Sequence, residues 1–492
     1  MDIDTPTRPV DRFDVEPVNA RKRQALYQPR VKIFPKRTAG FFRNLKWWIM
    51  AVTLGIYWVT PWLRWHRGPD APDQAVLVDL ANRRFYFFFI EIWPQEFYYI
   101  AGLLIMAGLG LFLVTSVVGR AWCGYTCPQT VWTDLYIWVE RFIEGDRNAR
   151  MRLDKAPWTL EKIGKRSAVY AVWLFIAVST GGAWVFYFAD APTLLRDLFT
   201  LNAEPVAYIT VGILTATTFV FAGFMREQVC TYMCPWPRIQ GAMLDEDSLL
   251  VTYNSWRGEP RSRGQKRALA EGIEAGDCID CNACVVVCPM GIDIRDGSQL
   301  ECINCALCID ACDEIMLRVG RPAGLIAFDT DAAVTAREAK QAPVYKLARG
   351  RTVYYAASLA AVSGLMLWGL THRSLIDLHV LRDRNPTFVT LHDGAIRNGY
   401  TLKIANRTFE PRPMEIRFAG PAGVQLKTPG EPTATQVLKV DIPPNEVRAV
   451  RVFVTAPRSS VKAANMPARF DVRAGEARTQ VATTFLSGAA NP

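Results

Sequence analysis

Cysteine is absent from the first 122 residues of this 492-residue chain and from its last 180. All 12 cysteines fall within residues 123–312, and eight of them lie within residues 278–312. A disulfide scaffold would spread its pairs across the fold, so this distribution argues against one. Clustered Cys-x2-Cys spacing instead indicates metal ligation in a reducing compartment.

Other familiar patterns are missing as well. The chain has no G-x-G-x-x-G fingerprint and no Walker motif, so neither a Rossmann site nor a P-loop is predicted. The first 45 or so residues are polar and basic and have no apolar core, so no cleavable signal peptide is expected. Only four histidines occur, and His372, His379 and His392 lie at or beyond the last apolar run. We expect these three to be surface residues, with a metal contact as the alternative.

Apolar residues are abundant where charge is sparse. Hydrophobic residues make up 50% of the chain, aromatic residues 11%, and tryptophan occurs 15 times, as in a membrane protein with aromatic belts. A bilayer is crossed by about 20 apolar residues in a helix. The segment 85–97 is aromatic but holds Glu91, Pro94 and Glu96, so we expect an interfacial or re-entrant segment there. The five predicted spans are residues 46–63, 97–118, 167–188, 205–225 and 352–371.

Positive charge is unevenly distributed between the loops. Residues 1–46 carry 11 lysines and arginines and residues 119–166 carry nine, whereas residues 189–204 carry only Arg196. The positive-inside rule therefore places the N-terminus in the cytoplasm and, with five spans, the C-terminus outside. Much of the net charge of +10 is thus explained by topology, and no nucleic-acid partner is predicted.

These features predict a membrane α-helical core with two further domains. Residues 1–45 form a basic cytoplasmic tail, residues 46–250 hold spans one to four, and residues 346–372 hold the fifth. Residues 251–345 form a cytoplasmic ferredoxin-like domain. Seven short runs of alternating polarity, separated by Gly, Pro and Asn, predict an Ig-like antiparallel β-sandwich over residues 373–492.

The strongest signal is a doubled cysteine motif. Cys278, Cys281, Cys284 and Cys288 follow C-x2-C-x2-C-x3-C, then Pro289, and the spacing recurs from Cys302. In bacterial two-cluster ferredoxins the fourth cysteine of each motif ligates the other 4Fe-4S cluster. A zinc site is the alternative, but zinc seldom uses eight cysteines in this arrangement. The predicted ligands are Cys278, Cys281, Cys284 and Cys312 for cluster 1, and Cys302, Cys305, Cys308 and Cys288 for cluster 2.

Four more cysteines form two pairs of the pattern C-x3-C-P. Cys123 and Cys127 follow the second apolar run, and Cys230 and Cys234 follow the fourth, 107 residues later. This repetition predicts two similar helix hairpins with the four sulfurs at the cytoplasmic membrane edge. Buried structural cysteines, a dithiol switch, a further cluster or zinc site, and a copper site all remain open. Soft thiolates favour Cu(I), and Met225, Met233 and Met243 lie nearby in sequence.

The residues after Pro128 have helical periodicity. Val131, Leu135, Val139 and Phe142 fall on one stripe, which predicts an amphipathic helix lying on the membrane. A thiol just ahead of such a helix is expected to have a lowered pKa.

Four segments resemble the CcoG/FixG/RdxA family of cytochrome c oxidase accessory proteins, over about residue 30 into the C-terminal domain. They are WCGYTCPQTVWTDLYIWVERFIEGDRNAR, YNSWRGEPR, DCIDCNACVVVCPMGIDIRDG and ECINCALCIDACDEIM. The resemblance implies a five-span polyferredoxin of the bacterial inner membrane with a periplasmic Ig-like domain. It also implies reduction of Cu(II) to Cu(I) during assembly of cbb3-type oxidase, with copper at Cys123, Cys127, Cys230 and Cys234.

The expected function is therefore that of a membrane iron–sulfur cupric reductase. The expected partners are the lipid bilayer, copper ions, copper chaperones, oxidase assembly factors and an electron donor that the sequence does not identify. A homodimer is left open. Two rivals remain: a quinol- or ferredoxin-linked electron-transfer protein of another respiratory pathway, and a non-catalytic copper-binding scaffold.

Overall fold

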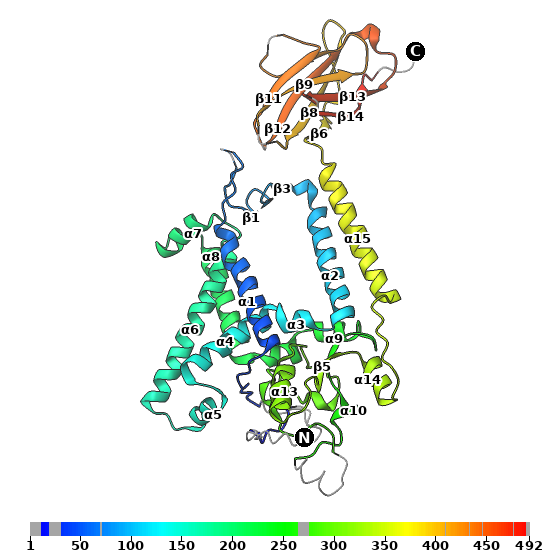
Figure 1. Ribbon diagram of the computed structural model, residues 1–492. Helices are drawn as coiled ribbons and strands as arrows, with labels where there is room; N and C mark the ends of the chain where they lie inside the picture. Colours follow the sequence, from blue (N-terminus) through cyan, green and yellow to red (C-terminus); the bar gives the residue numbers. More distant parts are fainter. Residues whose placement is uncertain are drawn as a thin grey trace. The chain divides into compact units, whose positions relative to one another are not determined.

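The computed structural model describes residues 11–18, 31–68, 71–263, 275–408, 410–431, 433–444, 446–475 and 477–488 (Figure 1). Much of the basic tail predicted for residues 1–45 lies outside these ranges. The chain divides into two compact units. One unit comprises residues 1–63 and 74–366, and the other comprises residues 64–73 and 367–492.

Four helices of the described residues are long and apolar enough to cross a membrane, judged by length and composition. The segment Pro94–Val118 contains a 3-10 turn and helix α2 (Tyr98–Val118). Helix α8 (Pro205–Val220) continues through a π-helical turn to Met225. The other two are α6 (Leu160–Val185) and α15 (Gly350–Thr371). These four helices overlap the second to fifth predicted spans.

The first predicted span is a helix of a different character. Helix α1 (Phe41–Val59) has 19 residues, but it is not among those four. Its first turns contain Arg43, Asn44 and Lys46, which lower its mean hydropathy. Both cationic side chains are buried in the protein, where they pair with Asp134. Four apolar helices are therefore confirmed among the described residues, but the prediction of five spans is not.

The segment 85–97 is a β-hairpin that leads into a 3-10 turn, not a re-entrant loop. Strands β1 (Val76–Asp79), β2 (Arg84–Phe87) and β3 (Ile90–Ile92) form an antiparallel sheet in this order. Glu91 accepts a hydrogen bond from Arg84 Nη1 at 3.1 Å. Glu96 accepts one from the backbone N–H of Trp93 at 3.2 Å. Both glutamates are thus buried structural groups of this hairpin.

The helix predicted after Pro128 is present as α4 (Pro128–Glu144) and is followed by α5 (Arg147–Lys155). Val131 and Val139 of the predicted stripe are buried, and Leu135 packs beside them. Phe142 departs from the prediction because it is 81% exposed. Helix α4 packs against α1 and α6, so its buried face is covered by protein.

The packing of the apolar helices agrees only partly with two similar hairpins. Helices α6 and α8 do pack together, and a Cβ on Gly181 would lie 2.9 Å from the carbonyl oxygen of Val211. They are joined through α7 (Ala191–Phe199). Helix α2 packs against α15, where Ser363 Oγ donates to the Met106 sulfur at 3.1 Å. Helix α1 packs instead on α4, through Met50, Leu54 and Val131.

A small α/β domain follows the second thiol pair. Strand β4 (Leu250–Tyr253) pairs antiparallel with β5 (Ile326–Asp329), and Leu250 lies opposite Asp329. Helices α12 (Ala283–Val287) and α13 (Leu307–Arg318) each begin inside one cysteine motif. Two further helices, α10 (Ser255–Gly258) and α14 (Asp331–Glu338), complete the domain. Val251, Ile315, Met316, Leu325 and Ile326 are buried in its core.

The second unit contains an antiparallel β-sandwich. One sheet has the order β10-β12-β8-β6 with β7 beside β8, and the other has the order β11-β9-β13-β14. Tyr400, Leu402 and Phe470 are fully buried between the sheets, and the Tyr400 and Phe470 rings meet edge to face at 5.1 Å. The seven predicted runs all coincide with strands. The strands are β6 (Ile376–Arg382), β7 (Val389–Thr390), β8 (Ile396–Asn406), β9 (Arg412–Ala419), β10 (Gln425–Lys427), β11 (Val437–Ile442), β12 (Glu446–Ala456), β13 (Asn465–Ala474) and β14 (Ala477–Leu486).

Candidate metal centres

The two cysteine motifs form loops with the same backbone turns. We call residues 278–288 loop 1 and residues 302–312 loop 2. Asp280 of loop 1 has φ 49° and Asn304 of loop 2 has φ 52°, and the next pair, Asn282 and Ala306, has φ 60° and 59°. Left-handed residues at alternating positions turn backbone N–H groups toward one side of a loop and create anion-binding concavities. Such a concavity suits thiolates that carry an iron–sulfur cluster.

The structure brings together the thiols of each predicted ligand set across the two loops. Cys312 lies on α13 and interacts electrostatically with Cys278, Cys281 and Cys284. Cys288, which follows α12, interacts in the same way with Cys302, Cys305 and Cys308. Each fourth cysteine therefore lies with the first three of the other loop, as the ferredoxin spacing predicts.

The chemistry of these eight thiols fits the predicted clusters. Cys284, Cys288, Cys302, Cys305 and Cys308 line a narrow apolar cavity with Ile292 and Ile294. Burial raises the pKa of Cys302 to about 11 and the pKa of Cys312 to about 12. Neutral thiols are therefore favoured without a metal, and the charge of bound iron is what stabilises thiolates. No described group of three His, Cys, Asp or Glu side chains is placed to hold a single metal ion. This finding applies to the four cysteines of the thiol pairs as well as to the eight cysteines of the motifs.

Loop 1 is held by an arginine and by the N-terminal segment. Arg295 donates from Nη1 to Asp280 at 2.8 Å and from Nη2 to Asn282 at 2.7 Å, so it fixes both left-handed residues. The backbone N–H of Phe13 donates to the Cys281 carbonyl at 3.2 Å. Asn282 Nδ2 donates back to the Phe13 carbonyl at 2.9 Å. No local pattern predicted this contact, because the residues are 269 positions apart.

Loop 2 is held by the segment that carries the first thiol pair. Helix α3 (Ala121–Tyr125) contains Cys123, and Tyr125 OH donates to the Cys305 carbonyl at 3.3 Å. A Cβ on Gly124 would lie 2.6 Å from the Ile303 carbonyl oxygen. The backbone of α3 therefore packs directly on the backbone of loop 2, with no room for a side chain between them. The buried Arg120 also donates to the Leu300 carbonyl. We call the predicted ligands of cluster 1 set 1 and those of cluster 2 set 2. The contacts of α3 place the first thiol pair beside set 2.

The four cysteines of the thiol pairs also lie near one another. Cys230 interacts electrostatically with Cys123, Cys127 and Cys234. Cys123 is buried, the other three are partly buried, and all four are free thiols. Cys123 Sγ donates to Gln240 Oε1 at 3.0 Å, a buried partner that sequence reasoning missed. Cys123 and Cys230 pack in the same apolar cluster as Cys288, Cys302, Cys305 and Cys308.

The backbone differs between the two pairs. Cys127 caps α4, with Pro128 as its first residue. Cys230 lies in a π-helical turn (Val229–Met233), and Pro235 caps the short helix α9 (Trp236–Gly241). Turns of this kind are rare and frequently found at functional sites.

The expected lowering of a thiol pKa is wrong for Cys127. Burial raises its pKa, although backbone N–H groups of Thr130 and Gln129 act in the opposite direction. Burial and the neighbouring thiols likewise raise the pKa of Cys230 to about 12. At Cys127, desolvation by burial exceeds the effect of the helix N-terminus. Burial therefore favours the neutral form of these thiols, and a bound metal would favour the thiolate.

The methionines and histidines add little to the site. Met233 is exposed, and the Met243 sulfur accepts a hydrogen bond from Tyr355 OH at 3.0 Å. His372 stacks on Trp368 at 5.1 Å, and His379 Nε2 lies 3.5 Å from Asp377. These side chains have packing or surface roles, as expected for the histidines.

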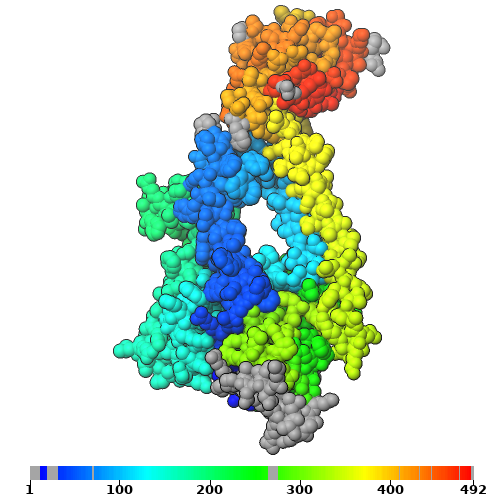
Figure 2. Space-filling model, in the orientation of Figure 1, coloured from blue at the N-terminus to red at the C-terminus, as the bar shows by residue number. Residues whose placement is uncertain are grey.

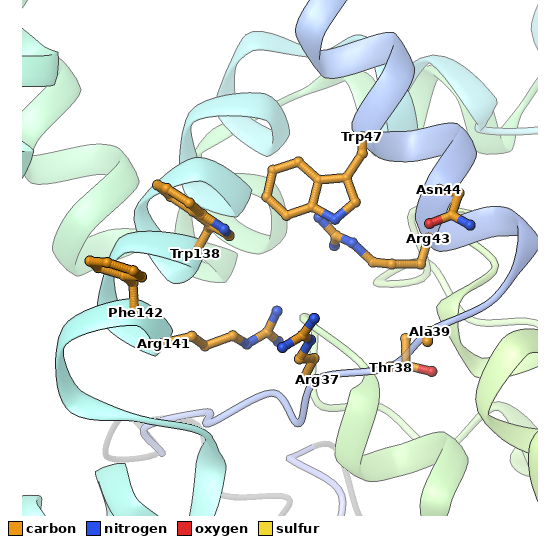
Figure 3. Close-up of a pocket in the computed structure, with 9 residues that line it drawn as sticks. All are labelled: Arg37, Thr38, Ala39, Arg43, Asn44, Trp47, Trp138, Arg141 and Phe142. Carbon is orange, nitrogen blue, oxygen red and sulfur yellow. The ribbon is translucent and has the colours of Figure 1, made fainter.

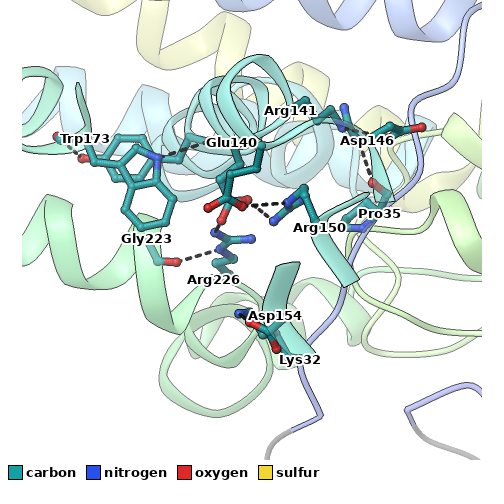
Figure 4. A network of polar contacts seen from close by, with 12 residues as sticks. Lys32, Pro35, Glu140, Arg141, Asp146, Arg150, Asp154, Trp173, Gly223 and Arg226 are labelled. Atoms are coloured by element: carbon teal, nitrogen blue, oxygen red, sulfur yellow. Dashed lines mark hydrogen bonds and ion pairs between the residues drawn. The ribbon is translucent and has the colours of Figure 1, made fainter. Parts of the chain in front are cut away.

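A buried ion network connects the segments that carry the two pairs (Figure 4). Glu140 of α4 accepts from Arg226 Nη2 at 2.7 Å and also binds Arg150. Arg226 has φ 43° and lies four residues before Cys230, so this bond fixes the turn into the second pair. Burial alone would raise the pKa of Glu140, but Arg226 and Arg150 bring it below its ordinary value. Because α4 starts at Pro128, the network couples the positions of both pairs.

Comparison with known proteins places the chain in a family. It is 57% identical over 477 residues to the nitrogen fixation protein FixG of Rhizobium meliloti, which covers 91% of each chain. The chain belongs to the FixG/RdxA family. Protein RdxA of Cereibacter sphaeroides is 55% identical, over 89% of this chain and 92% of its own. A crystal structure of a FixG-related protein from Vibrio parahaemolyticus shares 22% identity and covers 24% of this chain and 100% of its own, with a TM-score of 0.21.

Three domain families match parts of this FixG/RdxA-type chain. A 4Fe-4S dicluster domain matches residues 225–331, and a 4Fe-4S binding domain matches residues 100–145. The Ig-like fold found at the C-terminus of FixG matches residues 366–488. The chain is therefore an iron–sulfur protein with apolar helices suited to a membrane and an Ig-like C-terminal domain. The match over residues 100–145 contains just Cys123 and Cys127. It therefore does not by itself supply four ligands for a third cluster.

Proposed function

We propose that this chain is a membrane-bound cupric reductase that supplies Cu(I) for assembly of a cbb3-type cytochrome c oxidase. Two 4Fe-4S clusters carry the electrons, and Cys123, Cys127, Cys230 and Cys234 bind the copper. Copper is the substrate in this proposal and not a resident cofactor.

One observation carries the proposal: the shared apolar cluster of Cys123, Cys230 and the four cysteines of set 2. A thiol site that touches the surroundings of a redox centre can receive an electron without a mobile carrier. Set 1 lies in another buried group that includes Phe13 and Phe42 but neither thiol pair, and Cys302 and Cys308 of set 2 pack against both groups. Cys302 and Cys308, which pack against both groups, connect the two sets. The packing thus supports an electron path from set 1 through set 2 to the thiol pairs.

The redox balance is simple. Each Cu(II) accepts one electron and becomes Cu(I), and a bound 4Fe-4S cluster supplies one electron when it is oxidised. Thiolates stabilise Cu(I) relative to Cu(II), so a site built from them favours the reduction and retains the product. The protons displaced from the buried thiols leave to solvent. A separate reductant, which the proposal takes to be a soluble protein or a quinol, must re-reduce the clusters.

The proposal also includes sidedness and partners. The ferredoxin-like domain is placed in the cytoplasm and the Ig-like domain in the periplasm of the bacterial inner membrane, with five spans including α1. Copper chaperones and oxidase assembly factors are the proposed recipients. A periplasmic phosphatase fused to the C-terminus should be active, and one fused after Gly258 should be inactive. Activity at Gly258 would reverse the orientation.

The direct test uses anaerobically purified, dithionite-reduced protein that has been freed of reductant. It should contain about eight irons and eight sulfides per chain. On mixing with Cu(II) it should form about two Cu(I) per chain, captured by a Cu(I)-specific chelator, while the cluster absorbance returns to the oxidised spectrum. Copper binding without oxidation of the clusters would instead support a scaffold. Cluster oxidation by quinone but not by Cu(II) would support an electron-transfer protein of another pathway.

A further inference from the structure

A cavity of about 420 Å³ lies between the start of α1 and the C-terminal half of α4 (Figure 3). It is separate from the cysteines and plays no part in the proposed copper chemistry. Of the described residues that line it, none is acidic. Its cationic and aromatic lining residues are Arg37, Arg43, Arg141, Trp47, Trp138 and Phe142.

Carboxylates neutralise the three arginines to different degrees: Arg141 has a long ion pair with Asp146 at 3.9 Å, and the same carboxylate accepts from the backbone N–H of Arg37 at 3.0 Å. Arg43 donates two hydrogen bonds, of 3.0 and 2.7 Å, to Asp134. In the described structure, the side chains of Arg37 and Arg141 donate no hydrogen bond to a carboxylate. Arg141 Nη2 donates to the backbone carbonyls of residues 35 and 36. Its Nε is buried without a hydrogen bond in the described structure, and Asp146 Oδ1 lies 3.9 Å away.

The Arg37 side chain makes no hydrogen bond or ion pair that the described residues record. Figure 3 shows the guanidinium groups of Arg37 and Arg141 pointing toward one another. Like charges in this arrangement repel, and an anion between them would reverse the sign of the interaction. The Thr38 hydroxyl is also buried without a hydrogen-bond partner in the described structure. It adds a neutral donor to the lining of the same pocket.

The rim of the cavity is aromatic, and helix α1, which forms one of its walls, carries an exposed apolar stripe. The Trp47 and Trp138 rings meet edge to face at 6.3 Å, and Trp138 stacks on Phe142 at 5.9 Å. Trp48 is 73% exposed and begins a stripe on α1 that continues through Val52 and Ile56. This stripe extends about 12 Å along the helix from Trp48 to Ile56, since each residue rises about 1.5 Å. Figure 2 shows α1, in blue, on the visible surface of its unit.

We propose that this cavity binds the headgroup of an anionic phospholipid, with the phosphate between Arg37 and Arg141 and the acyl chains along α1. Arginine forks match the geometry of phosphate oxygens and bind them through paired hydrogen bonds. Tryptophans prefer the interface between headgroups and hydrocarbon, which suits Trp47 and Trp138. A free anion would use the arginines but would gain nothing from the aromatic rim and the apolar stripe.

The position of the lipid would stabilise the cluster domain. The backbone N–H groups of Phe42 and Arg43 donate to Asp310 of α13 at 3.2 and 2.7 Å. Helix α4, which forms the other wall, begins directly after Cys127. A headgroup between α1 and α4 therefore joins the membrane surface to two segments that hold loop 2 and the first thiol pair.

The test is native mass spectrometry of the purified full-length protein in mild detergent. Phosphatidylglycerol should bind more tightly than phosphatidylethanolamine. The double variant Arg37→Gln with Arg141→Gln should weaken phosphatidylglycerol binding by about tenfold or more, because two charge-assisted hydrogen bonds are lost. The matched control is Arg152→Gln with Lys155→Gln on α5, two exposed residues that remove the same charge. It should bind as the wild type does.

Three results would overturn the proposal. They are equal binding of the two lipids, undiminished binding by the double variant, and displacement of phosphatidylglycerol by inorganic phosphate at equal concentration. The last would identify a free-anion site. If the double variant does not fold, as judged by its iron content, the single variant Arg37→Gln replaces it, since that exposed side chain supports no described contact. Its binding must then fall while Arg152→Gln leaves binding unchanged.

Discussion

Loop 1 and loop 2 have the same spacing and nearly the same turns, yet their neighbours differ. Loop 1 is held by Arg295 and by Phe13 of the N-terminal segment. Loop 2 is held by Tyr125 and Gly124, which lie between the two cysteines of the first thiol pair. Two equivalent motifs thus acquire different roles from what packs on them: set 1 lies farther from the thiols, and set 2 lies beside them. This difference supports the proposed order of electron flow, from set 1 through set 2 to the thiol pairs.

The largest expected effect separates the two sets directly. Cys305→Ser, in set 2, should abolish transfer of an electron to Cu(II) in a single turnover of reduced protein. Cys281→Ser, in set 1, should leave one electron per chain that transfers at nearly the wild-type rate. Rapid mixing of each reduced variant with Cu(II) and a Cu(I) chelator measures both amplitude and rate. Equal loss in the two variants would show that the sets are not in series.

A smaller effect is expected where α3 meets loop 2. Gly124→Ala places a Cβ where the Ile303 carbonyl oxygen now lies within 2.6 Å, so α3 must move away from the loop. Overpacking of this kind costs about 1–3 kcal/mol. Electron transfer to Cu(II) should slow while the iron content stays near eight. The control is Gly108→Ala in α2, where an added Cβ meets nothing within 4 Å. An unchanged rate in Gly124→Ala would place the electron path elsewhere.

The smallest effect concerns the charge beside set 1. Arg295 interacts electrostatically with Cys284 and Cys278, so Arg295→Gln removes a positive charge close to cluster 1. A reduced cluster is then less stabilised, and the potential of cluster 1 should fall by tens of millivolts, roughly, whereas cluster 2 should change less. Redox titration followed by EPR resolves the two clusters. Arg261→Gln, at a partly exposed site, is the control. A larger shift in cluster 2 would contradict the arrangement of the two loops.

Much of this organisation could be predicted from local sequence patterns. Cysteine spacing predicted two sets of thiols that the structure brings together, since it depends on short loops, and alternating polarity located the strands of the sandwich. The character of α1 could not be foreseen, because Arg43 and Lys46 look like flanking charges until Asp134, 91 and 88 residues away, is seen beside them. The contacts of Gln240, Phe13 and Tyr125 escaped prediction for the same reason. They join residues more than 100 positions apart, and nothing in the local pattern marks either partner.

The pKa of Cys127 shows how tertiary packing can reverse a local rule. Its position at the start of α4 favours a thiolate, and the backbone N–H groups do act in that direction. Burial of the thiol has the larger effect and raises the pKa. The start of α4 could be predicted from the sequence, but the burial of the Cys127 thiol could not.

The central claim is that electrons leave the clusters at the thiol pairs, and the double variant Cys123→Ser with Cys230→Ser tests it most directly. Reduced protein carrying both changes should keep about eight irons and the wild-type cluster EPR. Its Cu(II) reduction should be lost or strongly reduced, with lower copper binding, whereas Cys284→Ser should lose turnover but keep much of its copper binding. A double variant that binds and reduces copper as the wild type does would contradict the account and make the four thiols structural.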